Sequence, residues 1–428
     1  MSWLAGRRPV ARRRRAAVLA MSGSLTALLL IPAAAAAAPS RPAAGLARLA
    51  AARPAAQAAG SARAWGEDAS GQRGDGVATA RSLSPVRVAL PAGTTVISVA
   101  TGGRHSLALT LAGQVLAWGN NSFGQLGDGT RAQSDVPVLV HLPEHSKVTA
   151  VAAGGGHSLA VTSAGQVLAW GENQYGQLGD GSTLASSVPV KVRLPKGTRV
   201  VSVAASYNCS MALTASGQVL AWGYNGSGQL GNGFHTASEI PVRVRLPAGV
   251  TARVLASGGY DGLALTSAGQ LLAWGDNSHG QLGDGTRISS DRPVRVRLPK
   301  GVRVVGIGAG SQHSLALTSS GRVLAWGDNE FGQLGTGTTK GSDVPVAVQL
   351  PAGVRVIAVS AGGGFSLALT SSGDVLAWGH NEDGQLGDGT TLRSLTPVRV
   401  ALPAGLAAVR LGAGPTTRHG LAIVSTRP

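Results

Sequence analysis

Residues 151–182 read VAAGGGHSLAVTSAGQVLAWGENQYGQLGDGS, and variants of this stretch recur along the chain. Seven of the eight tryptophans occupy its Leu-Ala-Trp-Gly position, spaced 53 residues apart once and 52 residues apart five times: Trp65, Trp118, Trp170, Trp222, Trp274, Trp326 and Trp378. A fixed period of this size indicates a solenoid, a propeller or another repeat array.

The residues within one unit predict strands rather than helices. Apolar residues alternate with small or polar ones in four short runs, and Gly or Pro interrupts each run before a helical spacing can develop. In the unit quoted above these runs are 148–154, 157–162, 166–171 and 189–194, here called strands A, B, C and D. Each unit is therefore expected to form one four-stranded antiparallel blade.

The two ends of the repeat array predict a closed ring. Seven units of 52 residues need 364 residues, which is the length from Trp65 to Pro428. The first unit begins at strand C, near 64–66, and the last ends with strands A and B, at 409–411 and 419–424. We therefore expect an all-β, seven-bladed propeller, closed by pairing of the N-terminal C/D strands with the C-terminal A/B strands, which removes two open sheet edges.

The repeats resemble those of the regulator of chromosome condensation family. The resemblance rests on the GGxHSLAL turn and strand (155–161 and 310–317), the LAWG strand end (168–171) and the GQLGxG loop (176–181), and it covers residues 65–428. It implies a seven-bladed propeller. The nuclear member of this family is an exchange factor for the GTPase Ran that docks on nucleosomes, and related propellers are protein-binding modules, including secreted inhibitors of β-lactamases. The repeats here are too uniform in length to contain an inserted wedge like that of the exchange factor.

The residues shared by all units are expected to build the core. In strand C, Leu168 and Trp170 point to one face and Val167 and Ala169 to the other, so large and small side chains can interlock between blades. The indole N–H groups then need buried acceptors. The repeated glutamines are interpreted as loop staples that bond the backbone: Gln72, Gln125, Gln177, Gln229, Gln281, Gln333 and Gln385.

One turn position contains four histidines, a thiol and a carboxylate: His105, His157, Cys209, Asp261, His313, Phe365 and His419. These residue types suggest a metal site, but side chains spread around a wide ring cannot converge on one tetrahedral ion. We expect no metal and no cofactor, with each histidine bonding backbone groups of its own or an adjacent blade. Cys209, the lone cysteine, is expected to be a buried, inert thiol.

Antiparallel strand order places the A–B turns and C–D loops on one rim and the B–C turns and D–A links on the other. On the first rim, positions that vary between repeats contain aromatic, Arg and polar side chains, the types enriched at binding hot spots. They predict a partner-binding surface made of Arg104, Asn208, Tyr260, Gln312, Arg418, Phe123, Tyr175, His279, Phe331 and Asp383. For Phe123, Tyr175 and Phe331, packing between blades is an equally good interpretation. The family resemblance also implies that His105, His157, His313 and Asp261 lie near this surface, because their turns match family positions on the partner-facing rim.

The opposite rim is basic, with Lys196, Arg199, Lys300, Arg303 and Arg355. The first 64 residues hold ten of the 37 basic residues and none of the 20 acidic ones, so the repeat array has a net charge of only +7. This excess, without interleaved aromatic residues, favours edge protection and solubility over specific nucleic-acid binding.

The N-terminal segment predicts export. Residues 1–38 combine an arginine cluster, an apolar stretch and a small-residue run, as an export signal does, and 39–63 form an Ala/Pro/Arg-rich, disordered linker before the propeller at 64–428. Secretory and twin-arginine export both remain open. An uncleaved anchor at 16–38 is the alternative, and only then is membrane attachment expected. Either way the propeller is extracellular or in the cell envelope, and the composition suggests a bacterial source.

No catalytic motif stands out in the repeats. The first hypothesis is a secreted or envelope-associated, non-enzymatic propeller that recognises a protein or cell-envelope ligand through one loop rim. The alternatives are an exchange-factor-like regulator of a small GTPase, if the protein is cytoplasmic, and an extracellular enzyme acting on a polymer.

Overall fold

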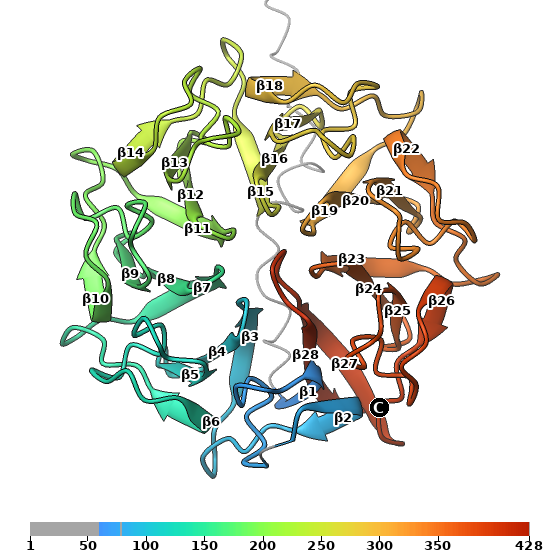
Figure 1. Ribbon diagram of the computed structural model, residues 1–428, viewed down its shortest axis with the longest axis horizontal. Helices are drawn as coiled ribbons and strands as arrows, with labels where there is room; N and C mark the ends of the chain where they lie inside the picture. The colour runs from blue at the N-terminus through green and yellow to red at the C-terminus, as the bar shows by residue number, and fades with distance from the viewer. Residues whose placement is uncertain (1–59, 78, 428) are drawn as a thin grey trace, which may run out of the picture. The chain divides into compact units, whose positions relative to one another are not determined.

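The computed structural model describes residues 60–77 and 79–427. These residues form seven four-stranded antiparallel sheets arranged as blades around a central axis, as predicted (Figure 1). The predicted export signal and residues 39–59 of the predicted linker lie outside the described residues. Within the described part, no helix has the length and apolar character needed to cross a membrane.

Six blades are formed by consecutive strands in the order A, B, C, D. Their strands are β3 (Val96–Thr101), β4 (His105–Thr110), β5 (Val115–Gly119) and β6 (Ser134–Leu139) in blade 1; β7 (Val148–Ala153), β8 (His157–Thr162), β9 (Val167–Gly171) and β10 (Ser186–Lys191) in blade 2; β11 (Val200–Ala205), β12 (Cys209–Thr214), β13 (Val219–Gly223) and β14 (Ser238–Arg243) in blade 3. Blade 4 comprises β15 (Ala252–Ser257), β16 (Asp261–Thr266), β17 (Leu271–Gly275) and β18 (Ser290–Arg295); blade 5 comprises β19 (Val304–Ala309), β20 (His313–Thr318), β21 (Val323–Gly327) and β22 (Ser342–Ala347); blade 6 comprises β23 (Val356–Ala361), β24 (Phe365–Thr370), β25 (Val375–Gly379) and β26 (Ser394–Arg399).

Blade 7 joins the two ends of the chain, which confirms the predicted closure. Its strand order is β2 (Arg81–Arg87), β1 (Ser61–Glu67), β28 (His419–Thr426) and β27 (Leu406–Gly412), and β1 lies beside β28 in Figure 1. The pairing of β1 with β28 runs from Ser61 opposite Val424 to Gly66 opposite His419. Because β1 begins at Ser61, the sheet starts three residues before the boundary expected from the sequence.

The outermost strands lie earlier in the repeat than the sequence suggested. The predicted D strand of blade 2 was 189–194, but β10 spans Ser186–Lys191. Pro189 has no N–H to donate to the ladder, and the register of β10 against β9 is irregular between Ser186 and Val190. The alternating apolar and basic residues that marked the predicted strand therefore continue into the link that follows it.

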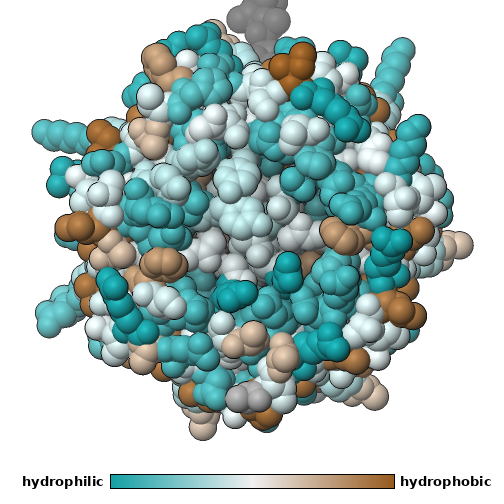
Figure 2. Space-filling view, in the orientation of Figure 1, coloured by the Kyte–Doolittle hydropathy of each residue, from teal (hydrophilic) through white to brown (hydrophobic). Residues whose placement is uncertain are grey.

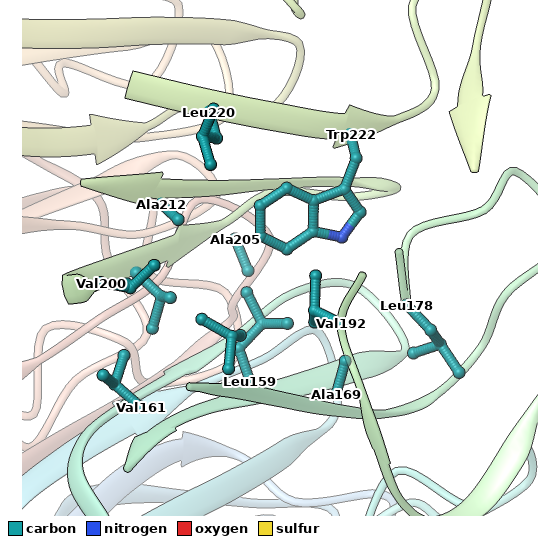
Figure 3. Close-up of a cluster of buried hydrophobic side chains, with 12 residues drawn as sticks. Leu159, Val161, Ala169, Leu178, Val192, Val200, Ala205, Ala212, Leu220 and Trp222 are labelled. Atoms are coloured by element: carbon teal, nitrogen blue, oxygen red, sulfur yellow. The ribbon is translucent and has the colours of Figure 1, made fainter. Parts of the chain in front are cut away.

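The core lies in the seams between neighbouring blades. Figure 3 shows one seam, where Leu220 and Trp222 of blade 3 face Leu159, Val161 and Ala169 of blade 2. Strand C thus has the two predicted faces, and the structure shows that the Leu/Trp face meets the preceding blade and the Val/Ala face the following one. The seven repeat tryptophans have no exposed surface.

Each buried tryptophan also donates a hydrogen bond across its seam. Trp222 Nε1 donates to the backbone carbonyl of Gln177 in the preceding blade, at 2.9 Å. All seven seams contain this bond, with donor–acceptor distances of 2.8–2.9 Å. The acceptor that a buried indole requires is therefore a loop carbonyl fixed by the adjacent repeat.

Opening the ring should abolish cooperative unfolding. A protein ending at Gly405 lacks β27 and β28, which exposes the edge of β1 and removes the strands packed around Trp65. We expect a broadened thermal transition at lower temperature and aggregation, measured by circular dichroism and light scattering. A circular permutant that joins residue 427 to residue 60 and opens at Gly197 keeps every strand and should retain one sharp transition. An unchanged melting temperature in the truncated protein would show that pairing of β1 with β28 does not stabilise the ring.

Candidate partner-binding rim

The A–B turns and C–D loops form one rim of the propeller, which we call the loop rim. The turns are 102–104, 154–156, 206–208, 258–260, 310–312, 362–364 and 413–418, and the loops are 68–80, 120–133, 172–185, 224–237, 276–289, 328–341 and 380–393, residue 78 excepted. One face of the propeller is shown in Figure 2. It is hydrophilic over most of its area, with apolar side chains scattered near the periphery and a hollow at the centre.

The predicted glutamine staples hold the C–D loops. Gln125 Oε1 accepts a hydrogen bond from the Phe123 N–H at 2.9 Å, and all seven loops repeat this contact. The backbone carbonyl of the same glutamine accepts the tryptophan N–H of the next blade. A loop is thereby fixed to its own blade through the glutamine side chain and to the neighbouring blade through the glutamine backbone.

A histidine–serine pair tightens four of the seven seams. His157 Nε2 lies 2.9 Å from Ser210 Oγ of the next blade, and that hydroxyl donates to the Gln177 carbonyl at 2.8 Å. The same pairing joins His105 to Ser158, His313 to Ser366 and His419 to Ser106. The histidines therefore bond a hydroxyl of the adjacent blade, where the sequence analysis expected backbone groups. Their side chains are buried, so they do not themselves contact a partner, and the expectation that His105, His157, His313 and Asp261 lie near a docking surface stays a prediction.

Three seams depart from this pattern. Cys209 faces a seam where Gly262 replaces the serine, and Phe365 faces Gly420 in the same way. At the remaining seam Ser314 is present, but the turn residue is Asp261, whose two carboxylate oxygens are buried without a hydrogen-bond partner. Asp261 is thus a buried polar group left unsatisfied in the described structure, which is costly.

Burial controls the charge of these side chains. Desolvation lowers the pKa of His105 and His313 to about 4, and that of His157 and His419 to about 3, so all four are neutral near pH 7. Desolvation likewise raises the pKa of Asp261 well above its usual value, with the nearby Asp276 charge adding to the effect. Burial raises the pKa of the Cys209 thiol to about 12, which agrees with the predicted inert thiol. Among the described residues, no cluster of three or more potential metal ligands occurs.

The predicted partner-binding residues all lie on the loop rim, with differing exposure. Arg104, Arg418, Phe123 and Tyr260 are exposed, Phe123 by 43% and Tyr260 by 38%. The others are half-buried: Asn208, Gln312, Tyr175, His279, Phe331 and Asp383. These residues therefore remain candidates, though most of them also contact other parts of the rim.

Many of these residues bridge two blades. Phe331 packs edge-on against His380 of the next blade, with ring centroids 4.5 Å apart, and His279 lies 3.8 Å from the Asp328 carboxylate. Arg104 pairs with Glu67 at 3.8 Å and Arg418 with Asp383 at 3.5 Å, both across seams. Such exposed ion pairs add little stability. For Phe331, packing between blades is the better interpretation.

The four tyrosines of the chain gather at one place on this rim. Tyr175 meets Tyr224 edge-on at 5.0 Å between ring centroids, Tyr224 meets Tyr260 edge-on at 6.0 Å, and Tyr260 stacks on Tyr207 at 5.4 Å. We call these residues the tyrosine cluster. It spans blades 2, 3 and 4, with Tyr207 and Tyr260 in A–B turns and Tyr175 and Tyr224 in C–D loops.

Two members of this cluster, Tyr207 and Tyr224, were not among the predicted partner-binding residues. Tyr207 stands where four other turns have glycine, at positions 103, 155, 259 and 363, and Tyr224 stands where four other units have a carboxylate, at 67, 172, 276 and 328. Both substitutions interrupt a nearly regular position in adjacent repeats. Comparing every turn position across the repeats, rather than only the most variable ones, would have found them.

The fold and this rim define a class of protein: a seven-bladed propeller of equal repeats in which a constant frame presents variable loops. The family model described as RCC1-like domain matches residues 61–418, and the chain belongs to this family. The ultraviolet-B receptor UVR8 of Arabidopsis thaliana is 35% identical over 77% of this chain and 74% of its own length. RUG3, a mitochondrial RCC1 domain-containing protein of the same plant, is 32% identical over 85% of this chain and 88% of its own length. The chain matches only 6% of the human ubiquitin ligase HERC2, at 34% identity.

Solved structures agree with the fold. Human WBSCR16 superposes with a TM-score of 0.77 at 25% identity, covering 86% of this chain and 99% of that chain. Yeast RCC1 (Prp20), in its complex with Kap60, superposes with the same TM-score and identity, covering 86% of this chain and 89% of the yeast chain. These similarities support a propeller that binds other proteins, and they leave this chain's partner unidentified.

Replacing Asp261 with histidine should stabilise the propeller. Gly258 leaves room beside residue 261 in the way that Gly154 does beside the His157 ring, and Ser314 supplies the hydroxyl that an imidazole Nε2 needs. We expect Asp261→His to raise the free energy of unfolding by about 1–2 kcal/mol at pH 7, because it replaces two unsatisfied carboxyl oxygens with one unsatisfied ring nitrogen, as in the four histidine seams, and adds a hydrogen bond. Urea denaturation measures the change. The double variant Asp261→His/Ser314→Ala should lose part of the gain, and an equal gain would exclude the bond to Ser314.

Stability should fall with acidification because of the four seam histidines. Their pKa values in the folded protein, about 3 to 4, lie below the ordinary value of 6.5 that the unfolded chain approaches. Between these values the unfolded chain binds more protons, so the free energy of unfolding decreases as pH falls from about 6.5. His157→Gln keeps an N–H donor for Ser210 and removes one titrating group. Its stability, from urea titrations between pH 7 and pH 4.5, should fall less steeply than that of the original protein. If the free energy of unfolding changes equally steeply with pH in both proteins, protonation of His157 does not contribute to the acid sensitivity.

Proposed function

We propose that this protein is an exported, non-enzymatic binding propeller that recognises a protein partner through the loop rim, with the tyrosine cluster at the centre of the contact. The observation that carries the proposal is the convergence of the chain's four tyrosines on blades 2 to 4. Tyrosine combines a large apolar ring with a hydroxyl, and it is among the residues that dominate binding energy at protein interfaces.

The cluster is both accessible and held in place, as a contact surface requires. Tyr260 is exposed, while stacking on Tyr207 and edge contact with Tyr224 restrict its ring. Burial raises the pKa of the Tyr260 hydroxyl, and the neighbouring tyrosines and Asp276 raise it further, so the group is a neutral hydrogen-bond donor. Side chains ordered before binding lose less conformational entropy when a partner docks.

Two carboxylates of the loop rim, Asp276 at the cluster and Glu172 beside Gly156 and Phe123, suggest the charge of the partner. Asp276 acts on Tyr260, and Glu172, whose pKa is raised by burial, stands in the same C–D loop as Tyr175. A half-buried carboxylate gains most from a cation that replaces its lost hydration. A protein surface that presents Lys or Arg to these residues, and an apolar side chain to the rings, fits the cluster best.

Exchange-factor activity on a small GTPase is the second candidate, favoured by the structural similarity to yeast RCC1. It requires a cytoplasmic location, whereas residues 1–38 have the composition of an export signal. Cell fractionation followed by N-terminal sequencing separates the two candidates. A propeller recovered outside the cytoplasm with residues 1–38 removed supports the first candidate, and an intact N-terminus in the cytoplasm supports the second.

Partner capture with matched variants tests the surface. The propeller carrying Tyr207→Ala and Tyr260→Ala should lose at least about thirtyfold in affinity for the captured partner, because hot-spot tyrosines contribute about 2 kcal/mol or more. The control is Phe234→Ala, which removes a 56% exposed aromatic side chain of the same rim outside the cluster. Binding of the purified partner is measured by calorimetry.

The outcomes distinguish the ligand classes. Loss of binding in the tyrosine variant, with binding retained in Phe234→Ala, supports the proposed contact. Equal binding by all three proteins would place the contact elsewhere. If the propeller retains a cell-envelope polymer and no protein, the partner is not a protein, and the same variants then test whether the polymer binds at the tyrosine cluster.

A further inference from the structure

The second rim of the propeller concentrates positive charge. We call it the link rim; it consists of the D–A links (88–95, 140–147, 192–199, 244–251, 296–303, 348–355 and 400–405) and the B–C turns (111–114, 163–166, 215–218, 267–270, 319–322 and 371–374). Ten Lys and Arg residues occur in these links and turns. Three of them, Arg193, Arg245 and Arg297, lie beside the C–D loops or an aromatic side chain of those loops. The remaining basic side chains are all exposed: Lys147, Lys196, Arg199, Lys300, Arg303, Arg322 and Arg355.

Several of these side chains are anchored by the turns beside them. The stem of Arg199 lies against Gly165, and those of Lys147 and Arg355 lie against Gly113 and Gly321. A side chain at those glycines would collide with the stem, so the B–C turn glycines make room for the basic residues of the following link. The aliphatic part is thereby packed while the charged group remains in solvent.

Negative charge is almost absent from this rim. Its described links and turns contain two acidic residues, Glu144 and Asp374. Asp374 is already engaged by Arg399 and Arg427. No ion pair within the described residues involves any of the seven basic side chains.

The loop rim has the opposite balance, with twelve acidic and seven basic residues in its turns and loops. The propeller is therefore polarised along its axis. Near an anionic surface, such a charge distribution attracts the link rim and repels the loop rim, which gives the bound molecule a defined orientation.

The shape and chemistry of the link rim favour a lipid surface over a nucleic acid. The seven links are of nearly equal length, so the rim presents a broad set of short turns rather than a groove that follows a strand. No Tyr, Phe or Trp occurs in these links and turns to stack on bases. Instead, Val201 and Ile357, at the link-rim ends of β11 and β23, are 44% and 51% exposed. Val201 follows Arg199 by two residues and Ile357 follows Arg355 by two, and such neighbouring apolar and basic side chains match the boundary between acyl chains and anionic headgroups.

We propose that the link rim docks the propeller onto an anionic membrane surface. Lys196, Arg199, Lys300 and Arg303 contact phosphate headgroups, and Val201 and Ile357 enter the interface between headgroups and acyl chains. Between the links of blades 4 and 5, Arg303 and Arg322 line a groove of about 730 Å³ that can admit a headgroup. The docked molecule presents its acidic loop rim, with the tyrosine cluster, away from the membrane. This inference does not depend on the identity of the loop-rim partner.

Vesicle co-sedimentation tests the proposal with the full chain processed as it is in its host. The probes are phosphatidylcholine vesicles with and without about one third phosphatidylglycerol, at about 0.05 M and about 0.5 M salt. The test variant reverses four link-rim charges: Lys196→Glu, Arg199→Glu, Lys300→Glu and Arg303→Glu. The control reverses four exposed basic residues of the loop rim, Arg131→Glu, Arg287→Glu, Lys340→Glu and Arg393→Glu, and so has the same net charge.

The original protein should bind only the anionic vesicles, and high salt should weaken this binding. The link-rim variant should lose at least about tenfold in partition coefficient and the control variant less than about threefold. Val201→Asn/Ile357→Asn should weaken vesicle binding without changing retention on a short DNA duplex, which distinguishes lipid contact from general attraction to polyanions. Equal losses in the two charge-reversal variants would overturn the proposal. So would DNA binding tighter than vesicle binding, or equal binding to both kinds of vesicle.

Discussion

The structure depends on one interaction repeated at seven seams: a buried tryptophan that packs on the preceding blade and donates its indole N–H to a glutamine carbonyl there. The ring supplies apolar contact area, and the hydrogen bond fixes the angle and height of one blade against the next. Because the acceptor is a backbone atom in a loop, the bond also positions that loop. The glutamine side chain adds a second restraint, because its Oε1 accepts a hydrogen bond from a backbone N–H of the same loop. Core packing and loop geometry are thus determined together, which lets the exposed loop residues vary without disturbing the frame.

Side-chain identity also varies inside the seams, at the turn position occupied by histidine in four blades and at the facing position in the next blade. Histidine and serine occur as partners at four seams, while cysteine, a weak hydrogen-bonding group, and phenylalanine, which has no polar side-chain atom, occur opposite glycine. Asp261 opposite Ser314 is the exception, and its raised pKa reflects the burial of an unsatisfied carboxyl. The seam at Asp261 also adjoins the tyrosine cluster, since Tyr260 precedes it. The seam with the unsatisfied carboxyl therefore lies under the surface proposed to bind a partner.

Much of this architecture could be predicted from the sequence because the repeat fixes it in several independent ways. The tryptophan spacing, the incomplete first and last units and the alternation in strand C each led to the closed ring. The outer strands were misplaced because they are recognised by weak alternation alone, and Pro189 shifts hydrogen bonding toward Ser186. The histidine partners were missed because they lie in the next repeat, 53 residues away for His157 and Ser210, where no local pattern indicates a contact. The tyrosine cluster required side chains from three blades, and only the ring geometry brings Tyr207, Tyr224 and Tyr260 together.

Charge follows the same division between a constant frame and a variable surface. The strand frame alternates direction, so each repeat contributes a C–D loop to one rim and a D–A link to the other. A small bias within the repeat, with Asp in the GQLGDG loop and Lys or Arg around the link, is then multiplied around the ring into two faces of opposite sign. An isolated repeat has only a small charge difference between its two ends, and the net charge of +7 over the array conceals the sum of these differences. The polarity would orient the molecule at any charged surface over distances of about one Debye length, before any specific contact forms. A propeller of this kind can therefore separate attachment from recognition, with the link rim setting its orientation and the loop rim left free to select a partner.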